Sequence, residues 1–247
     1  MSSDLVFGLH AVQAALTHDP GQVEALWVDR SRRDGRMREL LELAQSHGVP
    51  VHGVDARELD RRAPGQRHQG VIAACHAATI WDEAGLPDLV AQAPGAPLLL
   101  VLDGVTDPHN LGACLRTADA AGVTAVIAPK DKAVGLTPVV RKVASGAAER
   151  MPFVQVTNLA RTLEILKAQG VWIAGTSDRA TQSLYQADLK GPLAIVMGAE
   201  GKGLRRLTEE HCDFLLSIPM RGVVESLNVS VATGVCLYEA LRQRGGD

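Results

Sequence analysis

Two continuous apolar runs place the strongest constraint on the fold of this chain. Leu98–Leu102 (LLLVL) and Leu193–Met197 (LAIVM) contain no polar residue, whereas a strand with one face in water alternates apolar and polar side chains. Short apolar runs of this kind are typical of strands buried on both faces. Helical patterns lie between them, so the sequence predicts an α/β fold with a parallel sheet.

The chain divides into two α/β segments separated by a stretch rich in proline and glycine. Strand and helix patterns alternate over residues 4–76 and again from Pro97 onward, as in α/β layers. Between them, ATIWDEAGLPDLVAQAPGAP holds three prolines, which favours a linker with one helical turn around Leu86–Ala91. We therefore expect a first domain at 1–76, a linker at 77–96 and a second domain at 97–247.

Composition excludes several classes of protein. The chain is 46% apolar and 21% charged, which predicts a packed core rather than disorder. No apolar run reaches the ~20 residues of a membrane span, and MSSDLVFGLH lacks the pattern of a secretory signal. We expect a cytoplasmic protein with no membrane partner. The four cysteines form no CxxC pair and the eight histidines no HExxH, so we expect packing cysteines and no metal site.

Two arginine-rich stretches stand out against a formal net charge of −3. Residues 29–38 (DRSRRDGRMR) hold five arginines, and residues 1–76 contain no lysine. A second cluster consists of Arg61, Arg62, Arg67 and His68. Such runs usually form a solvated face, but guanidinium groups also match phosphate oxygens. The sequence leaves both interpretations open.

Three polar segments follow predicted buried strands, where α/β proteins place ligand sites. In LDGVTDPHNLGACLRTA, Asn110 suits a helix cap, and the apolar neighbours of Arg116 lead us to expect a buried, paired arginine. In IVMGAEGKGL, glycines permit close approach of a ligand. Their spacing fits neither the phosphate loop nor the dinucleotide fingerprint, and Glu200 would repel phosphate. In IPMRGVVESLNVS, the polar side chains exceed what a helix cap requires.

These three segments, in this order, resemble the signature motifs of the SpoU family of RNA ribose 2′-O-methyltransferases, part of the SPOUT superfamily. FGLHAVQAAL, HQGVIA and NLARTL extend the resemblance toward the bacterial branch that acts on 23S rRNA. The resemblance implies a C-terminal SPOUT domain with a parallel sheet and a deep trefoil knot. It also implies a preceding L30e-like α/β domain that binds the RNA substrate.

The resemblance further implies transfer of the methyl group of S-adenosylmethionine to the ribose 2′-hydroxyl of a guanosine, in the peptidyl-transferase P loop of 23S rRNA, without a metal. The implied catalytic residues are Arg116, Asn110, Glu200, Ser226 and Asn228. The implied cofactor-binding residues are Gly198, Ile218 and Leu227. We expect Ser226 and Asn228 to orient Arg116 or the ribose and Glu200 to hold Arg116 in place, within a homodimer to which the last helix contributes.

An arginine stays protonated near neutral pH, so Arg116 is at least as well suited to orient a phosphate and the hydroxyl as to abstract a proton. Two other functions remain open. A tRNA guanosine 2′-O-methyltransferase of the same family generally lacks the first domain. A catalytically silent RNA-binding protein on this fold would not need the polar residues of the three motifs.

Overall fold

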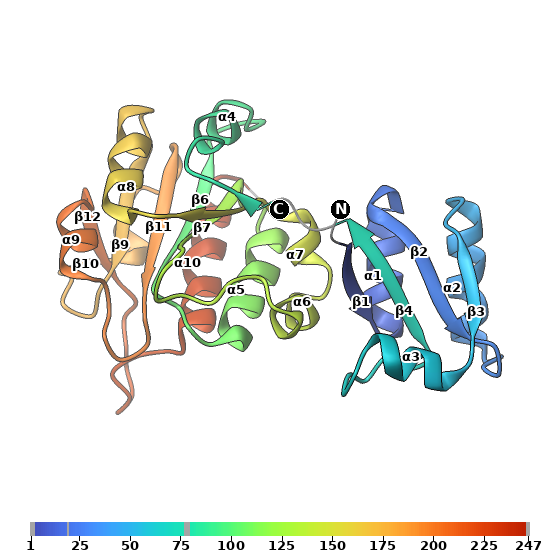
Figure 1. Ribbon diagram of the computed structural model, residues 1–247. Coiled ribbons are helices and arrows are strands. Elements are labelled where there is room, and N and C mark those ends of the chain that lie inside the picture. The colour runs from blue at the N-terminus through green and yellow to red at the C-terminus, as the bar shows by residue number, and fades with distance from the viewer. Residues whose placement is uncertain (1–2, 19, 77–79, 246–247) are drawn as a thin grey trace. The chain divides into compact units, whose positions relative to one another are not determined.

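A computed structural model describes residues 3–18, 20–76 and 80–245 (Figure 1). The chain forms two compact units, Met1–Ala78 with Pro138–Arg150, and Thr79–Thr137 with Met151–Asp247. The start of the expected linker (77–79) and the ends of the two expected domains (1–2 and 246–247) lie outside the described residues. The boundaries 1–76, 77–96 and 97–247 stay a prediction.

The first unit is built on a mixed sheet with the strand order β1-β4-β2-β3. Its strands are β1 (Ser3–Phe7), β2 (Val23–Asp29), β3 (Val51–Val54) and β4 (Val71–His76). Its helical segments are α1 (Leu9–His18), η1 (Pro20–Gln22), α2 (Gly35–Ser46), α3 (Ala56–Arg62), α6 (Pro138–Ala144) and α7 (Ala147–Arg150). Strand β3 runs parallel to β2, whereas β4 is antiparallel to both of its neighbours.

The two faces of this sheet are covered unequally. On one face, α1 and α2 contribute Leu16, Met37 and Leu40 to a core that is closed to solvent. On the other face, the seven-residue α3 supplies a much smaller core around Leu59. Trp27 and other strand residues are only partly buried there. A short helix cannot shield a whole sheet face, so part of this face remains accessible.

The HQG segment has a structural role in this unit. Gln69 adopts a left-handed backbone conformation (φ 50°), which is uncommon for a residue with a side chain. Its side-chain Oε1 accepts a hydrogen bond from the backbone N of Leu9 at 3.2 Å. That bond satisfies one of the free N–H groups at the start of α1. Gln69 therefore connects the start of β4 to the start of α1.

The second unit contains an eight-stranded sheet in which every neighbouring pair is parallel, with the order β10-β12-β9-β11-β6-β7-β8-β5. Its strands are β5 (Ile80–Trp81), β6 (Leu98–Asp103), β7 (Ala125–Pro129), β8 (Phe153–Val156), β9 (Trp172–Thr176), β10 (Gln182–Ser183), β11 (Leu193–Gly198) and β12 (Phe214–Ser217). The apolar runs at 98–102 and 193–197 are fully buried, which confirms the predicted central strands.

Helices cover both faces of this sheet (Figure 1). They are α4 (Leu86–Ala91), α5 (Pro108–Ala120), α8 (Leu159–Ala168), α9 (Arg206–Glu210) and α10 (Val229–Gln243), with the short helix η2 (Leu184–Gln186). Helices α4 and α8 pack into one core with the sheet. Helices α5 and α10 pack against each other, with Cys114 Sγ 3.6 Å from Thr233 Oγ1. No helix in the described part of the chain is long and apolar enough to cross a membrane.

One expectation differs from the structure in detail. Much of the predicted linker is folded, because β5 pairs with β8 and the side chain of Leu86 is buried in the core of the second unit. The helical turn expected at Leu86–Ala91 is confirmed as α4. The trefoil knot stays a prediction.

Candidate active site

The three polar segments meet at the carboxyl edge of the large sheet through one asparagine side chain. Asn228 Nδ2 donates to Asn110 Oδ1 at 3.0 Å and to Glu200 Oε1 at 2.6 Å. Asn228 Oδ1 accepts from the backbone N of Ser230 at 2.9 Å and from its Oγ at 2.6 Å. Both polar atoms of the Asn228 amide are engaged, which fixes its orientation. The two partners lie 118 and 28 residues away in sequence.

Each member of this cluster comes from a different element. Asn110 lies in the first turn of α5 and is nearly buried. Asn228 is the N-cap of α10, and Glu200 follows β11. The expectation that Asn110 caps its helix is wrong, because the N-cap is Asp107, whose carboxylate accepts from the backbone N of His109 at 2.7 Å. The side chain of Asn110 is therefore free to face Asn228.

The glycine loop after β11 turns back on itself. Ala199 N donates to Gly203 O at 3.1 Å, and Gly203 N donates to Ala199 O at 2.9 Å. Gly201 and Gly203 have φ values of 70° and 64°, which favour glycine. A Cβ on Gly198 would lie 2.3 Å from the backbone carbon of Gly203. The close approach that Gly198 permits is therefore made by the loop's own backbone.

An ion pair with a buried carboxylate anchors the far end of this loop, and the sequence analysis missed it. Asp103 ends β6, beside Gly198 of β11, and its side chain has no exposed surface. Its Oδ2 accepts from the backbone N of Arg205 at 2.8 Å, and its Oδ1 accepts from the Arg205 guanidinium. Buried charges require such partners. An acidic residue directly after an apolar run was the available signal.

Arg116 does not lie where the sequence led us to expect it. The residue is exposed on α5, and the structure shows no hydrogen bond or ion pair from it to any described residue. It follows Asn110 by six positions, which rotates its side chain by about 240° around the helix. The expectation of a buried, paired arginine is wrong. Glu200 and Asn228 bond to each other rather than to Arg116.

The remaining predicted residues lie on an open segment between β12 and α10. Ile218 and Leu227 are half-buried, whereas Ser226 is exposed. From Pro219 to Leu227 the structure shows no hydrogen bond to any other described residue. Backbone N–H and C=O groups along this segment are thus available to a bound molecule.

Three cysteine thiols near the sheet are unreactive. Burial raises the pKa of Cys114 to about 11, that of Cys212 to about 12 and that of Cys236 to about 12. A thiol with such a pKa stays protonated at neutral pH and is a poor nucleophile. Cys75, Cys114 and Cys236 are buried and Cys212 is half-buried, which confirms the expectation of packing residues. In the described ranges, no group of three His, Cys, Asp or Glu side chains gathers in a metal-binding arrangement.

Comparison with known proteins identifies the family of the chain. The profile of the SpoU rRNA methylase family matches residues 97–238. The chain belongs to the SpoU rRNA methylase family. A second profile, described as the RNA 2′-O ribose methyltransferase substrate-binding domain, matches residues 5–81.

Three similar proteins illustrate the family. The chain is 61% identical over 239 residues to the 23S rRNA (guanosine-2′-O-)-methyltransferase RlmB of Pseudomonas aeruginosa, covering 97% of this chain and 96% of that protein. The AdoMet complex of the SpoU methyltransferase AviRb from Streptomyces viridochromogenes has a TM-score of 0.78 at 26% identity, covering 98% and 90%. The A. aeolicus TrmH/SpoU tRNA-modifying enzyme has a TM-score of 0.57 at 32% identity, covering 66% and 84%. The SPOUT α/β fold predicted for the second domain is confirmed.

Proposed function

We propose that this SpoU-family protein transfers the methyl group of S-adenosylmethionine to the ribose 2′-hydroxyl of a guanosine in 23S rRNA, in the peptidyl-transferase P loop. The observation that carries the proposal is the convergence of all three family motifs on the Asn110–Glu200–Asn228 cluster. Support comes from the 61% identity to an enzyme of this name over nearly the whole chain.

The reaction needs alignment and proton removal rather than redox chemistry. The 2′-oxygen attacks the methyl carbon, the carbon–sulfur bond breaks, its electron pair stays on sulfur, and the hydroxyl proton leaves to a base or to water. Holding oxygen, carbon and sulfur in line accounts for much of such a rate enhancement. Asn228 orients the Glu200 carboxylate from one side, and this carboxylate is positioned to accept a hydrogen bond from the ribose.

The open segment fits S-adenosylmethionine. Gly198 and Ile218 lie at the carboxyl ends of two strands of one parallel sheet, where α/β folds bind nucleotides. Leu227 lies on the unbonded backbone that follows. We assign these three residues to adenosine and methionine contacts made mainly through backbone atoms. Ser226 then faces the ribose, and its exposed hydroxyl has no competing partner in the described chain.

The exposed Arg116 supports a homodimer. A side chain that turns away from its own cluster can complete the cluster of a second copy. Val231 and Tyr238 are each about half exposed on α10, at 53% and 50%. Their spacing of seven residues places them on one stripe of the helix. We propose that this stripe pairs two copies and that Arg116 orients the RNA phosphate and hydroxyl in the partner's site.

Complementation tests this arrangement. Arg116→Ala and Asn228→Ala homodimers should each be inactive, whereas mixed dimers should regain a substantial fraction of wild-type turnover. One mixed site then holds both wild-type side chains. A mixture that stays inactive although the two variants co-purify contradicts the shared site. A monomer with full activity contradicts the dimer itself.

The first unit favours rRNA over tRNA as the substrate. Residues 5–81 match a substrate-binding profile, whereas the tRNA-modifying relative spans only 66% of this chain. We propose that residues 1–76 bind the RNA, that residues 97–247 carry out methyl transfer, and that the protein works in the cytoplasm, where ribosomal RNA is assembled.

Mapping 2′-O-methylation on all rRNA and tRNA, from cells with and without this protein, tests the function. The expected result is the loss of one guanosine methyl group from 23S rRNA. Loss from tRNA alone overturns the choice of substrate. No loss from any RNA, together with intact RNA binding, favours the catalytically silent alternative.

A further inference from the structure

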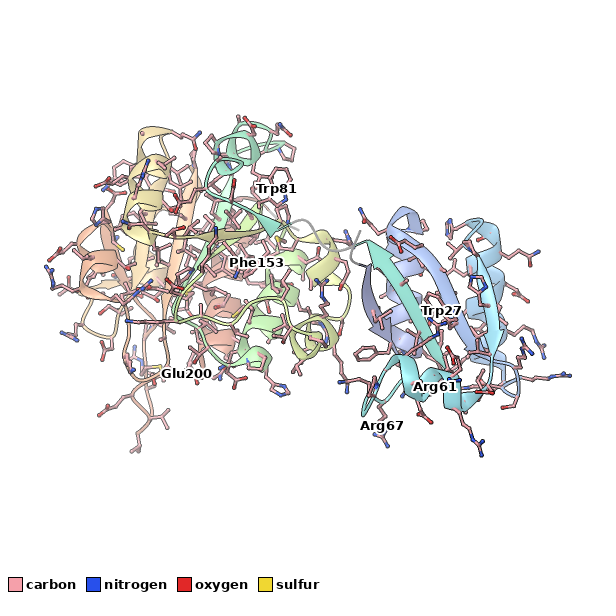
Figure 2. The ribbon with its side chains drawn as sticks, viewed as in Figure 1. Trp27, Arg61, Arg67, Trp81, Phe153 and Glu200 are labelled. Carbon is pink, nitrogen blue, oxygen red and sulfur yellow. The ribbon has the colours of Figure 1, made fainter. Side chains whose placement is uncertain are left out.

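The two arginine-rich stretches, which the sequence left unassigned, meet at one cavity of the first unit. The cavity lies at the carboxyl ends of β2 and β3 and has a volume of about 440 Å³. Its lining residues are Asp29, Arg30, Ser31, Gly53, Val54, Asp55, Ala56, Glu58 and Arg61. Figure 2 shows Trp27, Arg61 and Arg67 around α3 in this unit. The lining therefore includes one arginine from each stretch, Arg30 and Arg61.

Arg30 is held in place but keeps free donors. Its Nε donates to the carbonyl O of Gly53 at 2.6 Å. A Cβ on Gly53 would lie 3.0 Å from Arg30 Cγ, so the glycine leaves room for the arginine to lie across β3. In the described chain, no carboxylate pairs with the Arg30 guanidinium. Arg30 is exposed, and its two terminal nitrogens can bind two oxygens of one phosphate.

The acidic groups of the cavity are already engaged. Hydrogen bonds from the hydroxyl and backbone N of Ser31 hold the pKa of Asp29 below its usual value. Asp55 caps α3 through the backbone N of Glu58 at 2.8 Å. Glu58 pairs with Arg61 at 2.5 Å. Of the two arginines that line the cavity, Arg30 is the one that no described carboxylate pairs with, and three carboxylates line the cavity beside it.

A stacked ring pair lies just beside the cavity. Trp27 of β2 and His52 of β3 are paired in register, with ring centroids 5.7 Å apart and planes inclined by 26°. The guanidinium of Arg62 lies 4.4 Å from the centroid of the Trp27 ring, and Glu58 holds Arg62 at 3.0 Å. His52 is exposed. The His52 ring therefore lies at the open end of an ordered stack, despite the low aromatic content of the chain.

We propose that this edge binds an unpaired stretch of the RNA substrate, with a phosphate at Arg30 and an adjacent base stacked on His52. The proposal rests on the proposed function, because it states how the methylated RNA is held. Aromatic rings beside cationic groups are the usual means of binding single-stranded RNA.

Binding of a labelled domain V transcript of 23S rRNA to the full-length protein tests this site. Arg30→Gln should raise the Kd several-fold and reduce the slope of log Kd against log salt by about one, because one phosphate contact is lost. His52→Ala should raise the Kd at least about fivefold with an unchanged salt slope, because stacking is lost rather than charge. The Kd for S-adenosylmethionine should not change in either variant.

Arg38→Gln is the matched control, because Arg38 is an exposed arginine of α2 that does not line the cavity. Both site variants change exposed side chains, so their thermal midpoints should stay near that of the wild type. Wild-type Kd values for both variants overturn the proposal, as does an equal loss in Arg38→Gln. If the wild type methylates tRNA instead, the proposed substrate fails. The Kd values of the same variants are then measured on that tRNA. This separates a wrong substrate from a wrong binding site.

Discussion

The carboxyl edge of the large sheet carries two polar regions that are built in opposite ways. In the first region, Asn228 joins Asn110 and Glu200, and Asp103 anchors the glycine loop through Arg205. In the second region, residues 219–227 make no hydrogen bond to the rest of the described chain.

The difference indicates where alignment is fixed before substrates arrive. A network whose donors and acceptors are satisfied holds its geometry in the free protein. An unbonded segment has its backbone groups left for a ligand to satisfy. Under the proposed function, the cluster is preformed for the ribose, whereas S-adenosylmethionine completes its own binding segment.

The largest effect on turnover is expected in the glycine loop after β11, where the backbone leaves no space for a side chain on Gly198. Gly198→Ala places a Cβ 2.3 Å from the backbone of Gly203, so the loop with Glu200 must move. A displacement of about 1 Å can lower turnover about 100-fold. Gly222→Ala in the open segment, where nothing lies within 4 Å, is the control and should keep near-normal turnover. Methyl transfer from labelled S-adenosylmethionine measures both. An equal loss of turnover in the two variants contradicts the difference proposed between the two regions.

Arg205→Ala is expected to lower the free energy of unfolding, because it leaves the buried Asp103 carboxylate without its ion-pair partner. Because the Arg205 side chain is 45% exposed, the loss should be smaller than the about 3 kcal/mol that removing one partner of a fully buried pair costs. The midpoint of urea unfolding measures it. The double variant Asp103→Asn/Arg205→Ala should recover part of this loss, because the uncompensated charge is gone. A single variant as stable as the wild type shows that water already shields Asp103.

Two substitutions of Asn228 separate its capping of α10 from its proposed role in catalysis. Asn228→Asp keeps the oxygen that caps α10 but loses the donor to Glu200 and adds a like charge beside it. Turnover should fall about 100-fold, as when one aligned donor is removed, while the thermal midpoint changes little. Asn228→Ala should also lose about 1 kcal/mol of stability with the cap. Wild-type turnover in Asn228→Asp removes the cluster from the mechanism.

Amide hydrogen exchange compares the two regions directly. Residues 220–227 should exchange fast in the free protein and slow by up to about 100-fold at a ligand concentration of 100 Kd. Amides at 199 and 203, which are already hydrogen-bonded within the loop, should change much less. If ligand slows amide exchange only at residues 199–203, the cofactor binds to the glycine loop alone.

The smallest effect is expected at the far end of α10. Hydrogen bonds from Arg242 and Gln243 lower the pKa of Glu239 to about 2. A lowered folded-state pKa contributes stability above the ordinary value near 4.5 and loses it as pH falls toward 2. Because Arg242 is mostly exposed, the pair is worth about 0.5 kcal/mol. The thermal midpoints of Glu239→Gln and of the wild type should differ at pH 7. They should approach each other at pH 3. Catalysis at pH 7 should be unaffected.

The sequence predicted the buried strands well and the edges poorly. Leu98–Leu102 and Leu193–Met197 are apolar throughout, so burial on both faces follows from their composition. Strand β5, with two residues, carries no periodic signal and lies inside the predicted linker. Its place in the sheet depends on pairing with β8, which is distant in sequence.

The ring pair of the first unit was missed for a similar reason. Only 3% of the residues are aromatic, but stacking needs only two rings at one place. Trp27 and His52 meet because β2 and β3 are paired in register. Composition carries no information about register.

The sequence by itself determined the α/β class, the family and the identity of the motif residues, because each is encoded in local pattern or in motif order. The tertiary structure alone decided which of those residues touch. It brought Asn110, Glu200 and Asn228 together, turned Arg116 outward, and paired Asp103 with Arg205. The physical reason is that a parallel sheet places the ends of distant strands at one edge, while helical rotation decides which side chain faces that edge.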